Sequence, residues 1–466
     1  STVIETVGSR LQSATREIFD IKLVESRADL VASHLDARCT AGASHCLSRL
    51  GELSKLRSGL ILERDAARGK RKILSGQIGT LLKEKRENSA AQVADLKLDV
   101  QAAAAAAAAL DESRNTIEAE MREIYDSLPN VLDDRVPLGK DELSNVIVSS
   151  WGDDFIKNET ESMTYAHDEI AHRMGNLLNE PAVLMAGTRF SILTGHLARL
   201  ERALIQYFLD FHSGRGYEEI SIPYMVSAST LKGTGQIPKF KDDLFHLSNH
   251  KIGGDEDSYL IPTAEVPVLG TYRNQILSNS TLPIRHVCYS PCFRAEGGSA
   301  GRDTRGLIRQ HQFHKVELIK VCTPETAESE HIAMVNDVED ILKSLGLPHR
   351  RVLLSSGDTG FSARLCFDIE VWFPSQQCYR EISSISNCWE FQSKRLGLRY
   401  RVGTDTKSEK VYPHTLNGSG VAVGRALAAI LENFQYRSNQ DTSVGLVDIP
   451  IPLRPYVGVD TLKFKL

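Results

Sequence analysis

One segment of this chain combines charged and glycine residues in a way that could bind a phosphate-bearing ligand. It runs from Phe293 to Glu317, where two stretches of strand-like composition enclose a loop rich in Gly, Arg and Asp. Arginines in such a loop can present their guanidinium groups bidentately to phosphate oxygens. Taken alone, an arginine-rich loop is more often an ordinary solvated loop, so this segment does not establish a phosphate site by itself.

Three further segments are informative only in combination with the first: PTAEVPV at residues 262–268, FDIEVWFPSQQCYREISSISN at 367–387 and HTLNGSGVAVGRALAAILENFQ at 414–435. The Thr-Ala-Glu triplet of PTAEVPV carries no signal by itself. The third is a glycine-containing change from strand to helix, which is weak evidence by itself. The chain has no G-x-x-x-x-G-K-[ST] phosphate loop, so any nucleotide must be held by another device.

The body that must position these segments begins near Asn145, where short β-type runs alternate with helical ones. Examples of the β-type runs are Ser258–Pro262, Ile284–Tyr289, Phe313–Val321 and Phe367–Phe373. This pattern predicts an α+β domain over residues 136–466, built on a mostly antiparallel sheet.

Residues 1–135 are expected to form a separate N-terminal domain, with an antiparallel two-helix coiled coil over about 41–128. The first helix has a strict seven-residue seam at Leu53, Leu60, Ala67, Leu74 and Leu81. A second line, with Leu56 and Ile78, is interrupted by polar residues. The second helix alternates steps of three and four through Val93, Leu96, Val100, Ala103, Ala107, Leu110, Ile117, Met121, Ile124 and Leu128. The turn is predicted near Glu87 to Ala91.

The two helices carry opposite charge. Residues 49–87 hold eleven Lys or Arg against five Asp or Glu, whereas residues 93–128 hold three against eight. One interpretation is electrostatic complementarity within the hairpin. The other, compatible with the first, is that the basic helix also faces RNA phosphates.

Composition limits the remaining possibilities. The chain has 466 residues and a formal net charge of −5, so a polyanion must be bound by a local basic surface. None of the eight cysteines forms a C-x-x-C pair, which argues against a cysteine-ligated metal. No stretch approaches the ~18 apolar residues of a membrane helix.

Together the four segments resemble the class II aminoacyl-tRNA synthetases, in the form found in seryl-tRNA synthetases. Residues 293–317 resemble motif 2, residues 414–435 resemble motif 3, and the helical hairpin resembles the tRNA-binding arm. The resemblance implies a site for ATP, used as a substrate, that consists of Arg294, Ala295, Glu296, Arg309, Gln310, Phe313, Glu381, Ile382, Ser383, Ser384 and Arg425. It implies a site for serine that consists of Thr263, Ala264, Glu265, Arg294, Glu317, Asn417 and Ser419.

The resemblance also implies roles within these sites. Arg294 grips the α-phosphate and the amino-acid carboxylate, and Arg425 the γ-phosphate; these two are the expected catalytic residues. Glu296 contacts the adenine amino group and Phe313 stacks on the adenine. Glu381 and Ser384 hold Mg²⁺. Glu370 could add a ligand, although an acid on an alternating strand is more often solvated.

The expected activity is that of a serine–tRNA ligase acting on tRNA(Ser), with Lys83, Lys85 and Arg86 near the arm tip contacting the tRNA. The segment GYEEISIPYMV, with Pro223, resembles motif 1 and implies a homodimer, although it also fits an edge strand with a proline. The NGSG and RAEGGSAGRDTRG sequences resemble the bacterial and organellar branch. With Ser1 as the first residue, a mitochondrial matrix enzyme is expected, and a bacterial cytoplasmic one is the alternative.

Three other interpretations remain open. A catalytically dead paralogue predicts loss of Arg294, Glu296 or Arg425, all of which are present. A related ligase that charges a carrier protein predicts no long arm and a cysteine-containing metal site. A coiled-coil adaptor fused to a nucleotide-binding domain predicts no amino-acid activation.

Overall fold

The computed structural model describes residues 28–40, 42–84, 89–156, 163–252, 255–297, 306–403 and 408–466. Its contacts divide the chain into two compact units, one ending at Pro129 and the other beginning at Asn130. Within the described residues, no helix combines the length and the apolar character needed to cross a membrane.

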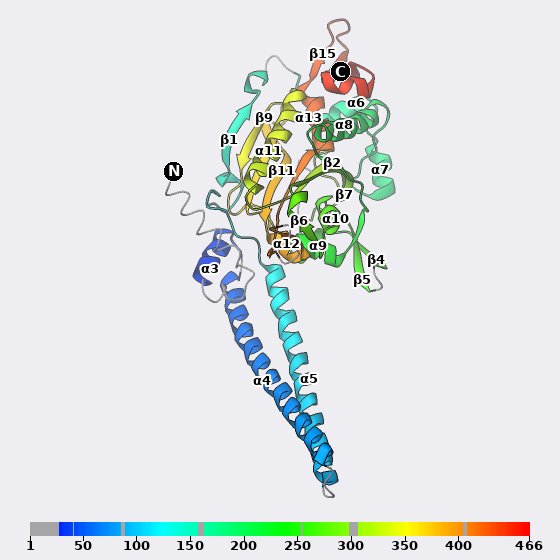
Figure 1. The fold of residues 1–466 in the computed structure, drawn as a ribbon. Coiled ribbons are helices and arrows are strands. Elements are labelled where there is room, and N and C mark those ends of the chain that lie inside the picture. The colour runs from blue at the N-terminus through cyan, green and yellow to red at the C-terminus, as the bar shows by residue number, and fades with distance from the viewer. Residues whose placement is uncertain are drawn as a thin grey trace, which may run out of the picture. The chain divides into compact units, whose positions relative to one another are not determined.

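The N-terminal unit consists of a short helix and two long ones that lie side by side (Figure 1). These are α3 (Ala28–Ala37), α4 (Ala43–Glu84) and α5 (Ser89–Ser127). The eight-alanine run lies within α5, as expected from the high helix propensity of alanine. With 42 and 39 residues, the two long helices each extend for about 60 Å.

The predicted seam is the buried side of the hairpin. Six of the predicted seam residues have exposed fractions of 7% or less, namely Leu53, Val93, Ala103, Ala107, Met121 and Leu128. The prediction for Leu56 was wrong, because this side chain is 54% exposed. Its heptad line continues through the exposed Glu63, Lys70 and Gln77, so this side of α4 faces solvent. The turn was predicted near Glu87 to Ala91, but α5 already includes Ser89 to Ala91, so this part of the prediction was wrong.

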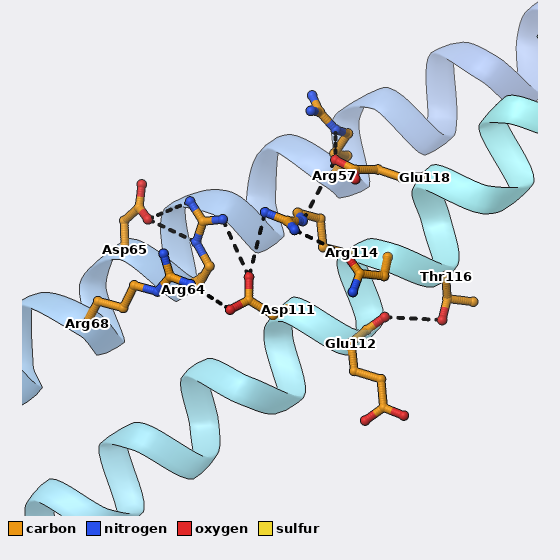
Figure 2. A network of polar contacts seen from close by, with 10 residues as sticks. Arg57, Arg64, Asp65, Arg68, Asp111, Glu112, Arg114, Thr116 and Glu118 are labelled. Carbon is orange, nitrogen blue, oxygen red and sulfur yellow. Dashed lines mark hydrogen bonds and ion pairs between the residues drawn. The ribbon is translucent and has the colours of Figure 1, made fainter. Parts of the chain in front are cut away.

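Arginines of α4 pair with acids of α5 along the hairpin (Figure 2). Arg57 Nε lies 2.7 Å from Glu118 Oε1, and Arg68 lies 2.7 Å from Asp111 Oδ2. Arg64 also reaches Asp111, at 3.5 Å. Solvent-exposed pairs contribute little stability individually, but they favour one register of the two helices. Electrostatic complementarity within the hairpin is therefore confirmed.

The C-terminal unit is built on an eight-stranded sheet of order β1-β9-β10-β11-β14-β8-β7-β2. Its strands are β1 (Val146–Trp151), β2 (Glu218–Glu219), β7 (Ile284–Phe293), β8 (Gln312–Cys322), β9 (His349–Leu353), β10 (Leu365–Phe373), β11 (Cys378–Trp389) and β14 (His414–Ala422). Every neighbouring pair is antiparallel except β2 with β7. The predicted α+β fold with a mostly antiparallel sheet is confirmed.

Three smaller sheets and nine helices complete the described part of this unit. The remaining strands are β3 (Met225–Ser227), β4 (His246–Ile252), β5 (Glu256–Leu260), β6 (Ile276–Ser278), β12 (Arg399–Arg401), β13 (Lys410–Val411), β15 (Gln435–Arg437), β16 (Val444–Asp448) and β17 (Thr461–Lys465). The helices are α6 (His167–Arg173), α7 (Asn179–Ala186), α8 (Gly195–Ser213), α9 (Ala228–Thr234), α10 (Glu265–Gly270), α11 (Ala327–Ser344), α12 (Phe391–Leu396), α13 (Val423–Asn433) and α14 (Arg454–Val457).

Helices α8, α11 and α13 pack on one face of the large sheet (Figure 1). Val316 and Leu318 of β8 and Leu416 of β14 point into this core. Because side chains alternate along a strand, Glu317 and Asn417 point to the other face, toward α9 and α10. The alternation thus separates an apolar face from a face that carries polar groups.

Several histidines are buried in the described part of this unit without an acidic partner in direct contact, among them His212, His331 and His414. Burial lowers the pKa of His212 and of His331 to about 4, and that of His414 to about 3, from an ordinary value of 6.5. Below pH 6.5 the unfolded chain therefore binds protons that the folded chain does not, so stability falls as the pH falls.

We expect a lower urea midpoint at pH 5 than at pH 7.5, with each histidine costing on the order of 2 kcal/mol at pH 5. The variant His331→Gln keeps a donor for the Ile385 carbonyl, 3.0 Å from Nε2, but does not titrate. Its midpoint should change less between the two pH values than that of the unaltered chain. An equal change of the urea midpoint in both proteins would show that His331 does not contribute to the pH dependence of stability. Glu265, whose pKa is raised, changes the stability with pH in the opposite direction. Its contribution is the same in both proteins and cancels when their midpoints are compared.

Candidate active site

A cavity of about 570 Å³ opens on the polar face of the large sheet, a size typical of small-molecule sites. Most residues predicted from the sequence line it: Thr263, Glu265, Arg294, Glu296, Arg309, Gln310, Phe313, Glu317, Glu381, Ile382, Ser384, Asn417, Ser419 and Arg425. They come from five separate elements and the segments between them. The fold therefore brings all four sequence segments to one place.

Three predicted residues do not line the cavity. Ala264 is fully buried at the start of α10. The backbone N–H of Ala295 donates to the Asp243 carbonyl at 2.9 Å. Ser383 lies between two lining residues of β11, so strand alternation turns its side chain away, and its hydroxyl donates to the Ser419 carbonyl at 2.5 Å. These residues can act on a ligand only through their backbone or their neighbours.

Two arginines are held at fixed orientations on the cavity wall. Arg294, just after β7, donates from Nε to the Pro262 carbonyl at 3.2 Å. Its guanidinium carbon lies 5.2 Å from the centre of the Phe313 ring, within range of a cation–π contact. Arg425, in the first turn of α13, donates to the Glu381 carbonyl at 2.6 Å. Such restrained guanidinium groups are suited to a phosphate chain.

Glu296 follows the end of β7 in the chain and lines the cavity. Its carboxylate pairs with Arg309 at 3.0 Å. Its carbonyl accepts from Arg189 at 2.7 Å, which ties this segment to the chain that precedes α8. Beside the Phe313 ring, this arrangement offers a planar apolar surface and a carboxylate acceptor, the groups that recognise a purine with an exocyclic amine.

Another part of the cavity wall is a compact set of buried polar side chains. The Thr263 hydroxyl donates to Glu317 Oε2 at 3.2 Å and accepts from Lys315 Nζ at 3.0 Å. Lys315 also pairs with Glu317 directly. Asn417 Nδ2 donates to Glu265 Oε1 at 2.7 Å. Carboxylates and hydroxyls at this density suit a small ligand that carries an ammonium group and a hydroxyl.

The pKa of Glu265 is raised to about 7. Burial is the main cause, and the charge of Glu317 acts in the same direction, whereas a hydrogen bond from Gln392 and the charges of Lys315 and Arg294 oppose it. A carboxyl group poised in this way responds to small changes around it.

The acidic part of the wall is arranged around Glu381 and Ser384 of β11. Burial favours a neutral Glu381, but the Arg425 guanidinium, 3.3 Å from Oε2, overcomes this and lowers the pKa of the carboxyl group. Glu370 does not line the cavity and pairs with Arg350 of β9 at 2.5 Å, so the expectation that it could add a metal ligand is corrected. A β-bulge between Ile369 and Glu370 shifts the register there. The acid opposite Ser384 is Asp368.

Comparisons with known proteins identify the family. Residues 18–132 match the seryl-tRNA synthetase N-terminal domain, and residues 246–434 match the tRNA synthetase class II core domain (G, H, P, S and T). The chain is 44% identical over 442 residues to a serine–tRNA ligase of Syntrophomonas wolfei, covering 95% of this chain and 98% of that protein. The chain belongs to the seryl-tRNA synthetase family.

Solved structures of seryl-tRNA synthetases agree with this assignment. The seryl-tRNA synthetase of Pyrococcus horikoshii, complexed with ATP, is similar with a TM-score of 0.82 and 31% identity, over 96% of this chain and all of that one. The cytoplasmic serine–tRNA ligase of Naegleria fowleri, in complex with AMP, is similar with a TM-score of 0.79 and 26% identity, over 94% and 97% of the two chains.

For this member of the seryl-tRNA synthetases, sequence reasoning missed several residues at or near the cavity, among them Lys315, Asp368 and Gln392. Lys315 lines it and shares the strand face of Phe313 and Glu317, so period-two alternation could have indicated it. Asp368 lies in a quoted segment, but only the pairing of β10 with β11 shows that it is opposite Ser384. Gln392, which contacts Glu265, lies on α12 outside every quoted segment and had no signal in the sequence.

Some predicted residues cannot be placed in the site. Lys83 is an exposed residue at the end of α4, whereas Lys85 and Arg86 lie outside the described residues. Most of the loop predicted to clamp phosphates, residues 298–305, also lies outside them.

Proposed function

We propose that this chain activates serine with ATP and transfers it to the 3′-terminal adenosine of tRNA(Ser). The observation that carries the proposal is the joining, in one cavity, of Arg294 and Arg425 with the buried carboxylates Glu265 and Glu317. Membership of the seryl-tRNA synthetases supports this activity. The arm formed by α4 and α5 is the part to which we assign tRNA binding.

In the first step, a serine carboxylate oxygen attacks the α-phosphorus of ATP, and the bond to the bridging oxygen breaks to release pyrophosphate. Negative charge then builds on the pentavalent phosphorus. Arg294 is placed to stabilise that charge, and Arg425 to hold the γ-phosphate of the leaving group. The adenine is held by stacking on Phe313 and by a hydrogen bond from its amino group to Glu296.

In the second step, the terminal hydroxyl of the tRNA attacks the carbonyl carbon of the adenylate, and AMP leaves. The polar set of the cavity keeps the serine in place during both steps. We assign recognition of the amino group to Thr263 and Glu265, and recognition of the hydroxyl to Glu317 and Ser419. Each of these groups lines the cavity and is largely buried, so a ligand that fails to pair with it loses affinity.

Magnesium fits this site if ATP supplies part of its coordination. Among the described residues, no three or more His, Cys, Asp or Glu side chains form a group that could hold a metal ion alone. We assign Glu381 and Ser384 as its protein ligands, oxygen donors of the kind that Mg²⁺ takes alongside phosphates and water. Bound there, the ion would neutralise charge on the phosphates. Isothermal titration of ATP with and without Mg²⁺, in the unaltered chain and in Glu381→Gln, would test the assignment.

A homodimer is the assembly that we propose. The edge strand β2 precedes Pro223, and beside them Tyr224 and Met225 are 40% and 48% exposed. Such apolar exposure next to a sheet edge favours pairing with a second copy. Light scattering would show the mass of one chain or of two. A mitochondrial matrix location, with bacterial cytoplasm as the alternative, rests on the motif sequences alone and is tested by cell fractionation.

ATP–pyrophosphate exchange across amino acids tests the proposed activity. Serine should give the fastest exchange. Alanine leaves the hydroxyl-binding groups unpaired and should be rejected strongly, whereas threonine is excluded only by its methyl group, a discrimination of ~1–3 kcal/mol. Threonine should therefore exchange faster than alanine. Faster exchange with alanine would contradict the assignment of Glu317 and Ser419, and no exchange with serine would refute the proposed function.

A further inference from the structure

Gln392 is a fully buried side chain of α12 that lies behind the cavity. Its amide nitrogen Nε2 donates to Glu265 Oε1 at 2.5 Å and to the Thr234 carbonyl at 3.2 Å. Its amide oxygen accepts from the Thr415 hydroxyl at 2.6 Å. One side chain thus joins α9, α10, α12 and β14.

The contacts leave only one orientation for the amide. A backbone carbonyl only accepts hydrogen bonds, so the group facing Thr234 must be the nitrogen. The second hydrogen of that nitrogen then points to Glu265, and the oxygen is left to accept from Thr415. Gln392 is therefore a donor to Glu265 because of its surroundings, and Thr415 helps to keep it so.

The donors to Glu265 converge on one of its two oxygens. Gln392 and Asn417 both donate to Oε1, and within the described part of the chain no hydrogen bond reaches Oε2. Because Glu265 lines the cavity, Oε2 is the oxygen that remains for a ligand. An ammonium group binds there well only if the carboxyl group is ionised.

We propose that Gln392 is a positioning residue for serine recognition, which keeps Glu265 ionised and turned so that Oε2 meets the amino group of serine. This inference rests on the proposed function. The charged and titratable groups that face Glu265 are Glu317, Lys315, Arg294 and the Cys388 thiol. With these in place, the hydrogen bond from Gln392 opposes the raised pKa of Glu265, which is already about 7. Loss of that donor leaves Glu265 mostly neutral at pH 7.

The test is the variant Gln392→Met, which keeps side-chain length and removes the donor. In ATP–pyrophosphate exchange at pH 7, we expect the KM for serine to rise about fivefold, because a neutral Glu265 binds an ammonium group poorly. The kcat and the KM for ATP should change by less than about threefold. The fall of kcat/KM for serine toward low pH should move upward by about one pH unit, with partial recovery by pH 8.5. Comparison with the unaltered chain at each pH cancels the titration of serine and ATP.

A matched control is Gln435→Met. Gln435 is also buried, and its side chain contacts Tyr165 and the Glu432 carbonyl, but it does not line the cavity. This variant should leave the pH profile for serine unchanged. Thr415→Val, which removes only the group that orients the amide, should shift the profile in the same direction by less, and it serves if Gln392→Met does not fold.

Two results overturn the inference: a KM for serine raised by the same factor at every pH, or an unaltered profile in both site variants. Either result would leave the proposed function intact if the unaltered chain activates serine. The proposed function fails separately, if the unaltered chain does not activate serine at all.

Discussion

Replacing Arg294 or Arg425 with alanine should lower serine-dependent ATP–pyrophosphate exchange by about two orders of magnitude or more. Each guanidinium group is restrained by a backbone carbonyl, that of Pro262 for Arg294 and that of Glu381 for Arg425. The charge of each is therefore already in position when negative charge develops on the phosphates. Preorganised groups of this kind stabilise a transition state without having to reorient during the reaction.

Arg454→Ala is a suitable control for these variants. Arg454 also donates to a backbone carbonyl, that of Ile449 at 2.9 Å, and lies 3.6 Å from Asp460, but it does not line the cavity. Exchange should be near normal in this variant, with the same far-ultraviolet circular dichroism in all of the proteins. Near-normal exchange in a folded Arg294→Ala or Arg425→Ala variant would show that the motif assignment is wrong.

Deleting the arm tip, residues 79–98, and closing the helices with a short linker should abolish tRNA charging while sparing adenylate formation. All residues that line the cavity lie in the unit that begins at Asn130. The pairs Arg57 with Glu118 and Arg68 with Asp111 lie outside the deletion and should keep the shortened helices in register. The expected loss follows from basic residues near the tip, which would no longer neutralise phosphates.

The salt dependence of tRNA binding tests whether the arm itself contacts tRNA phosphates. On α4, the exposed Lys70, Arg71 and Lys72 have no ion pair with any residue that the structure describes, whereas Arg57 is paired with Glu118. Replacing the three with alanine should make log Kd less dependent on log salt, by about 0.7 to 0.9 per lost contact. Arg57→Ala, the control, removes a charge already neutralised and should change the slope less.

The alternative is that the arm is only a structural or dimerising coiled coil. The tip deletion would then change the oligomeric mass and leave tRNA affinity and its salt dependence intact. Filter binding at several salt concentrations, together with light scattering on the same proteins, distinguishes the two.

The sequence by itself determined the features that depend on local periodicity. The seam through Leu53, Ala103 and Met121 follows from a helical repeat, and the strand that carries Phe313 and Glu317 follows from its composition and alternation. These patterns are read correctly because helix and strand geometry repeat over a few residues. The family resemblance of the four segments rests in the same way on contiguous residues, and it named most of the side chains that line the cavity.

Only the tertiary structure decided which groups act on one another across elements. Gln392 reaches Glu265 from 127 residues away, and no spacing rule links them. Strand pairing places Glu370 of β10 against Arg350 of β9, whereas Asp368 lies opposite Ser384 of β11. In each case the outcome depends on how elements that are distant in sequence pack together. The contacts between such residues decide the arrangement, and no periodic pattern along the chain links the residues that make them.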